Sequence, residues 1–85
     1  MKGTILHSLL IGVTRALVDS PELVFVTVTP SERGYNLDIQ VASSDIGKVI
    51  GKQGRTARAI RSIVGAAAVK LKTTACVNIA ALPLR

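Results

Sequence analysis

The sequence is poor in aromatic side chains: it has one phenylalanine, one tyrosine and no tryptophan among 85 residues. Proteins that stack bases on a platform of aromatic rings need several such side chains, so this scarcity argues against that kind of nucleic-acid binding. The chain also has one cysteine, Cys76, and one histidine, His7. A lone cysteine forms no internal disulfide, and this pair makes no metal site. We therefore expect a reducing, cytoplasmic setting, no metal and no cofactor.

Long apolar runs are absent as well, and none approaches the roughly 18 residues of a membrane span, so we expect no membrane insertion. The single histidine, single cysteine and five scattered acids supply no pair of nucleophile and general base, and we expect no enzymatic activity. The chain is 48% hydrophobic and 19% charged, which suffices to bury a core. We predict a single domain over residues 1–85.

Acidic side chains are missing from the second half of the chain. Residues 1–45 hold three basic and five acidic side chains, whereas residues 46–85 hold eight basic and no acidic ones. The formal net charge of the whole chain is +6 at pH 7. Positive charge concentrated in one part of a sequence favours a polyanionic partner, with nucleic acid ahead of acidic lipid.

Apolar periodicity and turn signals divide the chain into six elements. Residues 5–17 follow a helical period, with His7 and Thr14 on the polar side. Residues 23–29, a turn over 30–34 and the alternating residues 35–41 predict a hairpin. A short helix follows the capping side chains of residues 43–45, a longer helix runs from Gly54 to about Leu71, and residues 75–82 predict a third strand. The order α-β-β-α-α-β predicts an α+β fold with three helices on one face of a three-stranded sheet.

The longer helix is predicted to have two distinct faces. Its apolar face consists of Ile60, Ile63, Val64, Ala67 and Leu71. Three arginines at steps of three residues occupy a different arc, namely Arg55, Arg58 and Arg61. A solvated helix face is one interpretation of this arc. Its position directly after a basic loop favours contact with phosphates.

The most specific local feature is the segment 46–55, IGKVIGKQGR, between the two predicted helices. Gly51 and Gly54 lack a Cβ atom, which lets a backbone approach a phosphate, and the helix that follows begins with free N–H groups. Lys52 and Arg55 add positive charge at the same place. A G-x-x-G on its own is more often a tight turn between helices. The basic residues beside it and the order of the elements favour anion binding.

Residues 49–61, VIGKQGRTARAIR, together with this order of elements, resemble the KH domain in its type II arrangement. The resemblance covers essentially the whole chain and is closest to the short bacterial single-KH-domain RNA-binding proteins of the KhpA group. It implies a single-stranded RNA-binding protein that grips about four nucleotides through its G-x-x-G loop. It implies a role as an RNA chaperone or post-transcriptional regulator. It also implies a homodimer, a pairing with a larger KH-containing RNA-binding protein, or both.

Carried over onto this sequence, the resemblance assigns the RNA contacts. They are Lys48, Ile50, Gly51, Lys52, Gln53, Gly54, Arg55, Arg58 and Arg61. An apolar groove floor for the bases is placed on Ile46, Ile50 and Ala57, with strand 35–41 as the far wall. The competing hypothesis is a KH-fold protein–protein assembly module with little RNA binding of its own. It would use the alanine-rich stretch 65–69 and the strand 75–82.

Overall fold

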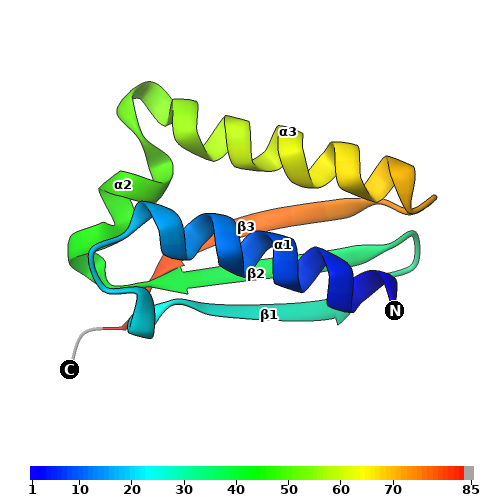
Figure 1. Ribbon diagram of the computed structural model, residues 1–85, viewed down its shortest axis with the longest axis horizontal. Coiled ribbons are helices and arrows are strands. Elements are labelled where there is room, and N and C mark those ends of the chain that lie inside the picture. Colours follow the sequence, from blue (N-terminus) through cyan, green and yellow to red (C-terminus); the bar gives the residue numbers. More distant parts are fainter. Residues whose placement is uncertain (84–85) are drawn as a thin grey trace.

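The computed structural model describes residues 1–83, and it has the predicted order of elements (Figure 1). Its helices and strands are α1 (Lys2–Leu17), β1 (Phe25–Pro30), β2 (Tyr35–Val41), α2 (Ile46–Ile50), α3 (Arg55–Lys70) and β3 (Ala75–Ala81). Short 3-10 turns precede β1, α2 and α3, namely Pro21–Leu23, Ser43–Asp45 and Lys52–Gly54. The first strand begins two residues later than predicted because Pro21 opens the first of these turns.

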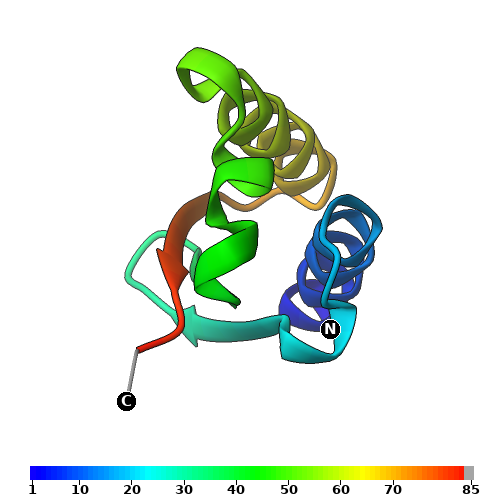
Figure 2. The same cartoon turned by 90° about the vertical axis from the view of Figure 1, so that its left-hand side faces the viewer.

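Within the described residues the sheet has the order β1-β2-β3. Strands β1 and β2 are antiparallel, which confirms the predicted hairpin, and β3 lies parallel to β2 with Val77 opposite Leu37. A parallel neighbour needs a long crossover connection, and the segment containing α2 and α3 supplies it. All three helices cover the same face of the sheet, as Figures 1 and 2 show, so the predicted layering is confirmed.

The hydrophobic core lies between the helices and the covered face of the sheet. Strand β2 contributes alternate side chains that are completely buried, namely Leu37, Ile39 and Val41. This alternation confirms a strand with one buried and one wet face. The helices close the core with Leu6, Leu10, Val49, Ile60 and Val64. The middle strand is therefore fixed by packing from all three helices.

Several side chains differ from the expected helix faces, and Thr14 and Ile63 do so most clearly. Thr14 is predicted on the polar side of α1, but it is fully buried, and its Oγ1 donates a 2.8 Å hydrogen bond to the Leu10 carbonyl oxygen. That bond within the helix satisfies the hydroxyl, which permits its burial. Ile63 is predicted in the core, but 47% of it is exposed. The buried face of α3 instead includes Ala57 and Ala68, whose small side chains bring the helix close to its neighbours.

Candidate nucleic-acid interface

The backbone between α2 and α3 requires glycine at two positions. Gly51 has φ 77° and ψ 171°, a region that is essentially restricted to glycine. A Cβ atom there would overlap Thr56 Oγ1 and come within 2.8 Å of the Thr56 nitrogen. Gly54 is left-handed, with φ 74° and ψ 15°, but a Cβ atom there would meet nothing within 4 Å. Gly51 is therefore needed for conformation and space, and Gly54 for conformation alone.

The tip of this loop is held by two arginines at the start of α3. Gln53 is left-handed, with φ 56° and ψ 26°, which is uncommon for a residue with a side chain. Arg58 Nη2 donates a 3.0 Å hydrogen bond to the Gln53 carbonyl oxygen, and Arg55 Nη2 lies 3.4 Å from Gln53 Oε1. The Gly54 nitrogen donates to the Gly51 carbonyl oxygen at 3.1 Å and closes the turn. The loop is thus a defined turn that α3 supports.

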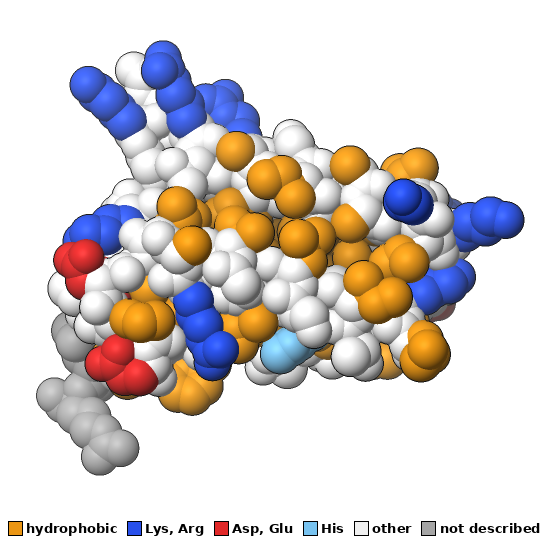
Figure 3. Space-filling view, in the orientation of Figure 1, with side chains coloured by type: hydrophobic (Ala, Val, Ile, Leu, Met, Phe, Trp, Pro, Cys, Tyr) orange, Lys and Arg blue, Asp and Glu red, His pale blue; other side chains and the backbone are white. Residues whose placement is uncertain are grey.

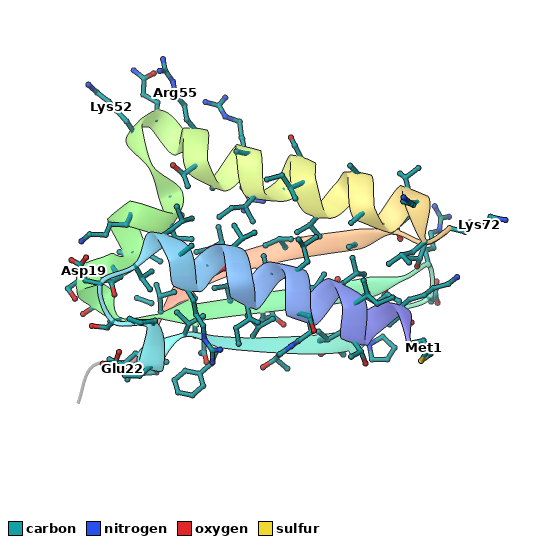
Figure 4. All side chains as sticks on the ribbon, in the orientation of Figure 1. Met1, Asp19, Glu22, Lys52, Arg55 and Lys72 are labelled. Carbon is teal, nitrogen blue, oxygen red and sulfur yellow. The ribbon has the colours of Figure 1, made fainter. Side chains whose placement is uncertain are left out.

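Positive side chains surround this turn. Lys52 and Arg55 point outward from one end of the molecule (Figure 4), and Figure 3 shows Lys and Arg side chains standing together there. All four cations of the loop and of the first half of α3 are exposed, namely Lys52, Arg55, Arg58 and Arg61. Within residues 1–83 none of them forms an ion pair. Cations without carboxylate partners are available to contact phosphates.

Arg61 joins α3 to the outer edge of the sheet. Its Nε donates a 3.3 Å hydrogen bond to the Val77 carbonyl oxygen of β3. The Thr74 carbonyl oxygen and the Leu82 nitrogen both bond to β2, at 3.0 Å and 2.7 Å. Backbone groups alternate in direction along a strand, so the polar groups of Val77 and of its odd-numbered neighbours in β3 face away from β2. These groups form the open edge of β3 beside α3.

The expected groove is corrected in two respects. Strand 35–41 was assigned to its far wall, but this strand is β2, the middle strand of the sheet, and the assignment is wrong. Edge strand β3 is the one that packs against both α2 and α3. Of the expected floor residues, Ile46 and Ile50 are half-buried, whereas Ala57 is only 3% exposed. Ala57 therefore offers no surface to a base.

Lys48 and Asp45 link the start of α2 to the end of α1. The Lys48 ammonium lies 3.1 Å from Asp19 Oδ2 and 3.6 Å from Asp45 Oδ1. Asp45 is 1% exposed, and its two oxygens accept the backbone N–H groups of Asp19 at 3.2 Å and of Ser20 at 3.1 Å. The expectation that Asp45 caps the following helix is wrong, because no side-chain cap bond forms at α2. Asp45 caps a distant segment instead.

These contacts set the charge states of both residues. Burial, the largest single effect, raises the pKa of Asp45, but the N–H groups of Asp19 and Ser20 together with Lys48 outweigh it and hold the pKa below its ordinary 3.8. The Asp19 carboxylate raises the pKa of Lys48 above its ordinary 10.5, first through the hydrogen bond that it accepts from the ammonium group and second through its negative charge. Lys48 is thus charged but already paired. Within residues 1–83 its ammonium group is held by two carboxylates and, unlike that of Lys52, is not free for a phosphate.

A separate pocket lies between α1 and the sheet, away from the loop. It is lined by Met1, Gly3, Thr4, His7, Val28 and Tyr35. His7, expected to be solvated, is half-buried there. No group of three or more His, Cys, Asp or Glu side chains in residues 1–83 is placed to hold a metal ion. No helix in this part of the chain has the length and apolar character needed to cross a membrane.

Comparison with known proteins identifies the family. A model of the KH domain of KhpA and KhpB matches residues 7–79. The chain is 48% identical over 65 residues to RNA-binding protein KhpA of Clostridium acetobutylicum, covering 76% of this chain and 87% of that protein. The proteins of the same name from Caldanaerobacter subterraneus subsp. tengcongensis and Treponema pallidum are 46% identical over 67 residues (79% and 89% of the two chains) and 49% identical over 65 residues (76% and 81%). No solved structure matched. Given the family match over most of its length, this chain belongs to the KhpA/KhpB KH-domain family.

Proposed function

We propose that this protein binds single-stranded RNA and grips about four nucleotides through the loop Gly51–Gly54, as an RNA chaperone or post-transcriptional regulator. The observation that carries this proposal is the glycine-dependent turn with four exposed cations around it, none of them in an ion pair within the described residues. Relatives that share about half of their aligned residues with this chain are named RNA-binding proteins. The family is one of KH RNA-binding proteins and not of enzymes.

Each part of the interface has a distinct task in this proposal. The backbone at Gly51 and Gly54 approaches a phosphate, and Lys52 and Arg55 neutralise its charge. Arg58 uses one donor on the loop carbonyl and keeps others for a phosphate, because a guanidinium has five N–H donors. The bases lie over the exposed parts of Ile46 and Ile50, with the open edge of β3 on the far side.

A lone domain of this kind should bind weakly. Without aromatic rings to stack on, about four contacted nucleotides give a dissociation constant near the roughly 10⁻⁴ to 10⁻⁶ M of non-specific binding. Useful affinity then comes from a second RNA-binding domain, supplied by a second copy or by a larger KH-containing protein. A monomer that bound a defined RNA at nanomolar affinity in physiological salt would contradict this part of the proposal.

The test reverses the charge of the loop while keeping both glycines. The variant Lys52→Asp/Gln53→Asp places two carboxylates where phosphates are proposed to lie. Asp tolerates the left-handed conformation of residue 53, and both positions are exposed, so folding should persist. The matched control is Ser8→Asp/Arg15→Asp, which makes the same change of net charge on the exposed side of α1.

Fluorescence anisotropy with a labelled single-stranded RNA measures binding, and urea unfolding checks the fold of both variants. We expect the loop variant to lose RNA binding and the α1 variant to retain most of it. Equal binding by the loop variant and the parent would show that the G-x-x-G assignment is wrong. Equal losses in both variants would show that only net charge matters.

A second function, protein–protein assembly, is favoured by apolar side chains on the outer side of the helix layer. Ile5 of α1 is 49% exposed and Ile63 of α3 is 47% exposed. These two helices pack against each other, and Figure 3 shows hydrophobic side chains gathered over them. The stretch 65–69, expected to serve this role, is divided: Val69 is 74% exposed, but Ala68 is buried. We propose that a partner KH chain docks on this helix layer.

A further inference from the structure

The acid-free half of the chain builds one continuous side of the molecule. The described residues 46–83, which hold seven basic and no acidic side chains, contain α2, α3 and β3. Helix α3 packs on β3, and β3 begins at the end of the molecule where α3 ends (Figure 1). We call the surface between Arg61 on α3 and the open edge of β3 the α3–β3 side. It leads from the G-x-x-G loop to the opposite end of the molecule. Within the described residues α2, α3 and β3 hold no carboxylate, and Asp38 of the neighbouring strand β2 accepts a 3.1 Å hydrogen bond from Asn78 of β3.

Two further cations, Arg33 and Lys72, lie at that opposite end. Arg33 belongs to the turn between β1 and β2, and Lys72 to the turn between α3 and β3. Thr74 joins the two turns: its Oγ1 donates a 2.9 Å hydrogen bond to the Arg33 carbonyl oxygen, and its own carbonyl oxygen accepts the Tyr35 N–H at 3.0 Å. Both cations are exposed, and neither forms an ion pair in the described part of the chain. The one acidic residue in these two turns is Glu32. Figure 4 places Lys72 at the end of the molecule opposite Lys52 and Arg55.

The backbone at Lys72 is one that usually carries glycine. Lys72 has φ 59°, its nitrogen donates to the Val69 carbonyl oxygen at 2.9 Å, and the Thr73 nitrogen donates to the Ala68 carbonyl oxygen at 2.9 Å. These two bonds form the arrangement that ends many helices with a left-handed glycine. A cation at a helix C-terminus is favourable in itself, but Lys70 already supplies one there. A lysine in the left-handed position therefore suggests a use for its charge beyond ending the helix.

From this placement we propose that an RNA longer than four nucleotides continues along the α3–β3 side and makes a second phosphate contact with Arg33 and Lys72. The inference rests on the proposed RNA binding and extends it. The long axis of the molecule measures 36 Å, which a stacked strand rising about 3.4 Å per nucleotide would cover with about ten nucleotides. The loop holds only about four. Arg61 lies between the two ends and already belongs to the cations around the G-x-x-G loop, so the extended path adds the contacts of Arg33 and Lys72.

The test compares a short and a long RNA through the salt dependence of binding. Each phosphate contact to a single strand contributes about 0.7 to the slope of log K against log salt. A 12-nucleotide oligouridine should therefore show a slope steeper by about 1.4 than a 4-nucleotide one, because two contacts are added. The longer RNA also offers more positions at which the protein can bind. These raise the association constant by the same factor at every salt concentration and so leave the slope unchanged. Native mass spectrometry selects conditions in which one protein binds one RNA.

The variant Arg33→Gln/Lys72→Gln should lose the added slope and bind the 4-nucleotide RNA as the parent does. The matched control is Arg15→Gln/Lys70→Gln, which removes the same charge from exposed positions. Lys70 follows Arg61 by nine residues, which places it on the opposite side of α3 from β3. This control should keep the added slope. Glycine suits the left-handed backbone at position 72, so Lys72→Gly should fold at least as well as the parent. This variant should lose about half of the added slope.

Three results would overturn the extended path: equal slopes for both RNAs with the parent, an added slope that survives in Arg33→Gln/Lys72→Gln, or an equal loss in the Arg15→Gln/Lys70→Gln control. If the Arg33/Lys72 variant weakens binding to vesicles containing anionic lipid and leaves the 12-nucleotide slope unchanged, the two cations serve a membrane surface instead. The short RNA reports on the loop alone. If the parent fails to bind the 4-nucleotide RNA, the result counts against the proposed function. If the parent binds it but shows no added slope with the 12-nucleotide RNA, the result counts only against the second contact.

Discussion

The Arg58 guanidinium donates a 3.0 Å hydrogen bond to the carbonyl oxygen of Gln53, five residues earlier in the chain. Gln53 is one of two residues other than glycine with a positive φ in the described chain. The bond ties this left-handed tip to the first part of α3. Arg58 therefore supports the shape of the loop and also supplies part of its charge.

Replacing Arg58 with alanine should lower RNA affinity about tenfold, because one charged hydrogen bond to phosphate, of roughly 1.5 kcal/mol, is lost. The slope of log K against log salt should fall by about 0.7. Arg58→Lys keeps the charge but lacks the planar fork of donors, so it should keep the slope and lose part of the affinity. Anisotropy titrations across a salt series measure both quantities. If Arg58→Lys matches the parent in both, the bond to Gln53 is irrelevant to binding.

The two loop glycines should differ in their effect on stability. Gly54→Ala places a left-handed residue in open space and should cost about 1 kcal/mol in the free energy of unfolding. Gly51→Ala adds a collision with Thr56 to a backbone region that other residues avoid, and should cost about 3 kcal/mol. Urea unfolding followed by circular dichroism measures both. Equal losses would contradict the different packing of the two positions.

The buried carboxylate of Asp45 should make the fold sensitive to acid. Its pKa lies below 3.8 in the folded protein, so the folded state binds this proton less readily than the unfolded chain does. Its stabilising contribution is therefore present above about pH 4 and is lost as the pH falls through the lowered pKa. Thermal unfolding between pH 7 and pH 2 follows this loss. Asp45→Asn should melt at a lower temperature at pH 7 and lose less on acidification than the parent.

The control for this experiment is Glu22→Gln, which removes an exposed acidic group from the turn before β1. It should leave the acid transition close to that of the parent, because Glu22 forms no ion pair within residues 1–83. An unchanged acid transition in Asp45→Asn would show that the bonds from Asp19 and Ser20 do not depend on the carboxylate charge.

Periodicity predicts the elements of this fold because each element buries one side. The alternation of Leu37, Ile39 and Val41 reports a strand with one covered face, and the structure places all three in the core. The loop is equally local: its two glycines lie within four residues, and their positive φ values follow from their own sequence. Features that depend on a short stretch of chain are therefore visible in the sequence.

Features that depend on contacts between distant segments are not visible in the sequence. Asp45 bonds to Asp19, 26 residues away, and no local pattern distinguishes this role from helix capping. The Asp19 carboxylate in turn pairs with Lys48 at 3.1 Å, although the sequence marks Lys48 only as one more cation near the loop. The position of β2 in the middle of the sheet also depends on which strands pair, and the order of strands along the chain leaves that open. The pairing moves the far side of the proposed RNA site from β2 to β3.

Self-association and RNA binding should respond differently to salt and to substitution. If the exposed helix layer forms a dimer by apolar burial, Ile63→Gln should raise the dissociation constant at least tenfold, because each copy loses an apolar side chain whose burial contributes about 1.5 kcal/mol. Folding should persist, since 47% of Ile63 is already exposed. Sedimentation equilibrium should find the dimer nearly unaffected by salt and by Arg58→Ala, because apolar burial releases no counterions.

RNA binding to a single domain should follow the opposite pattern. Its slope of log K against log salt should be roughly −2 to −3, and Ile63→Gln should leave this slope unchanged. Strong self-association beside RNA binding that is absent or independent of salt would make assembly, and not RNA binding, the function of this fold.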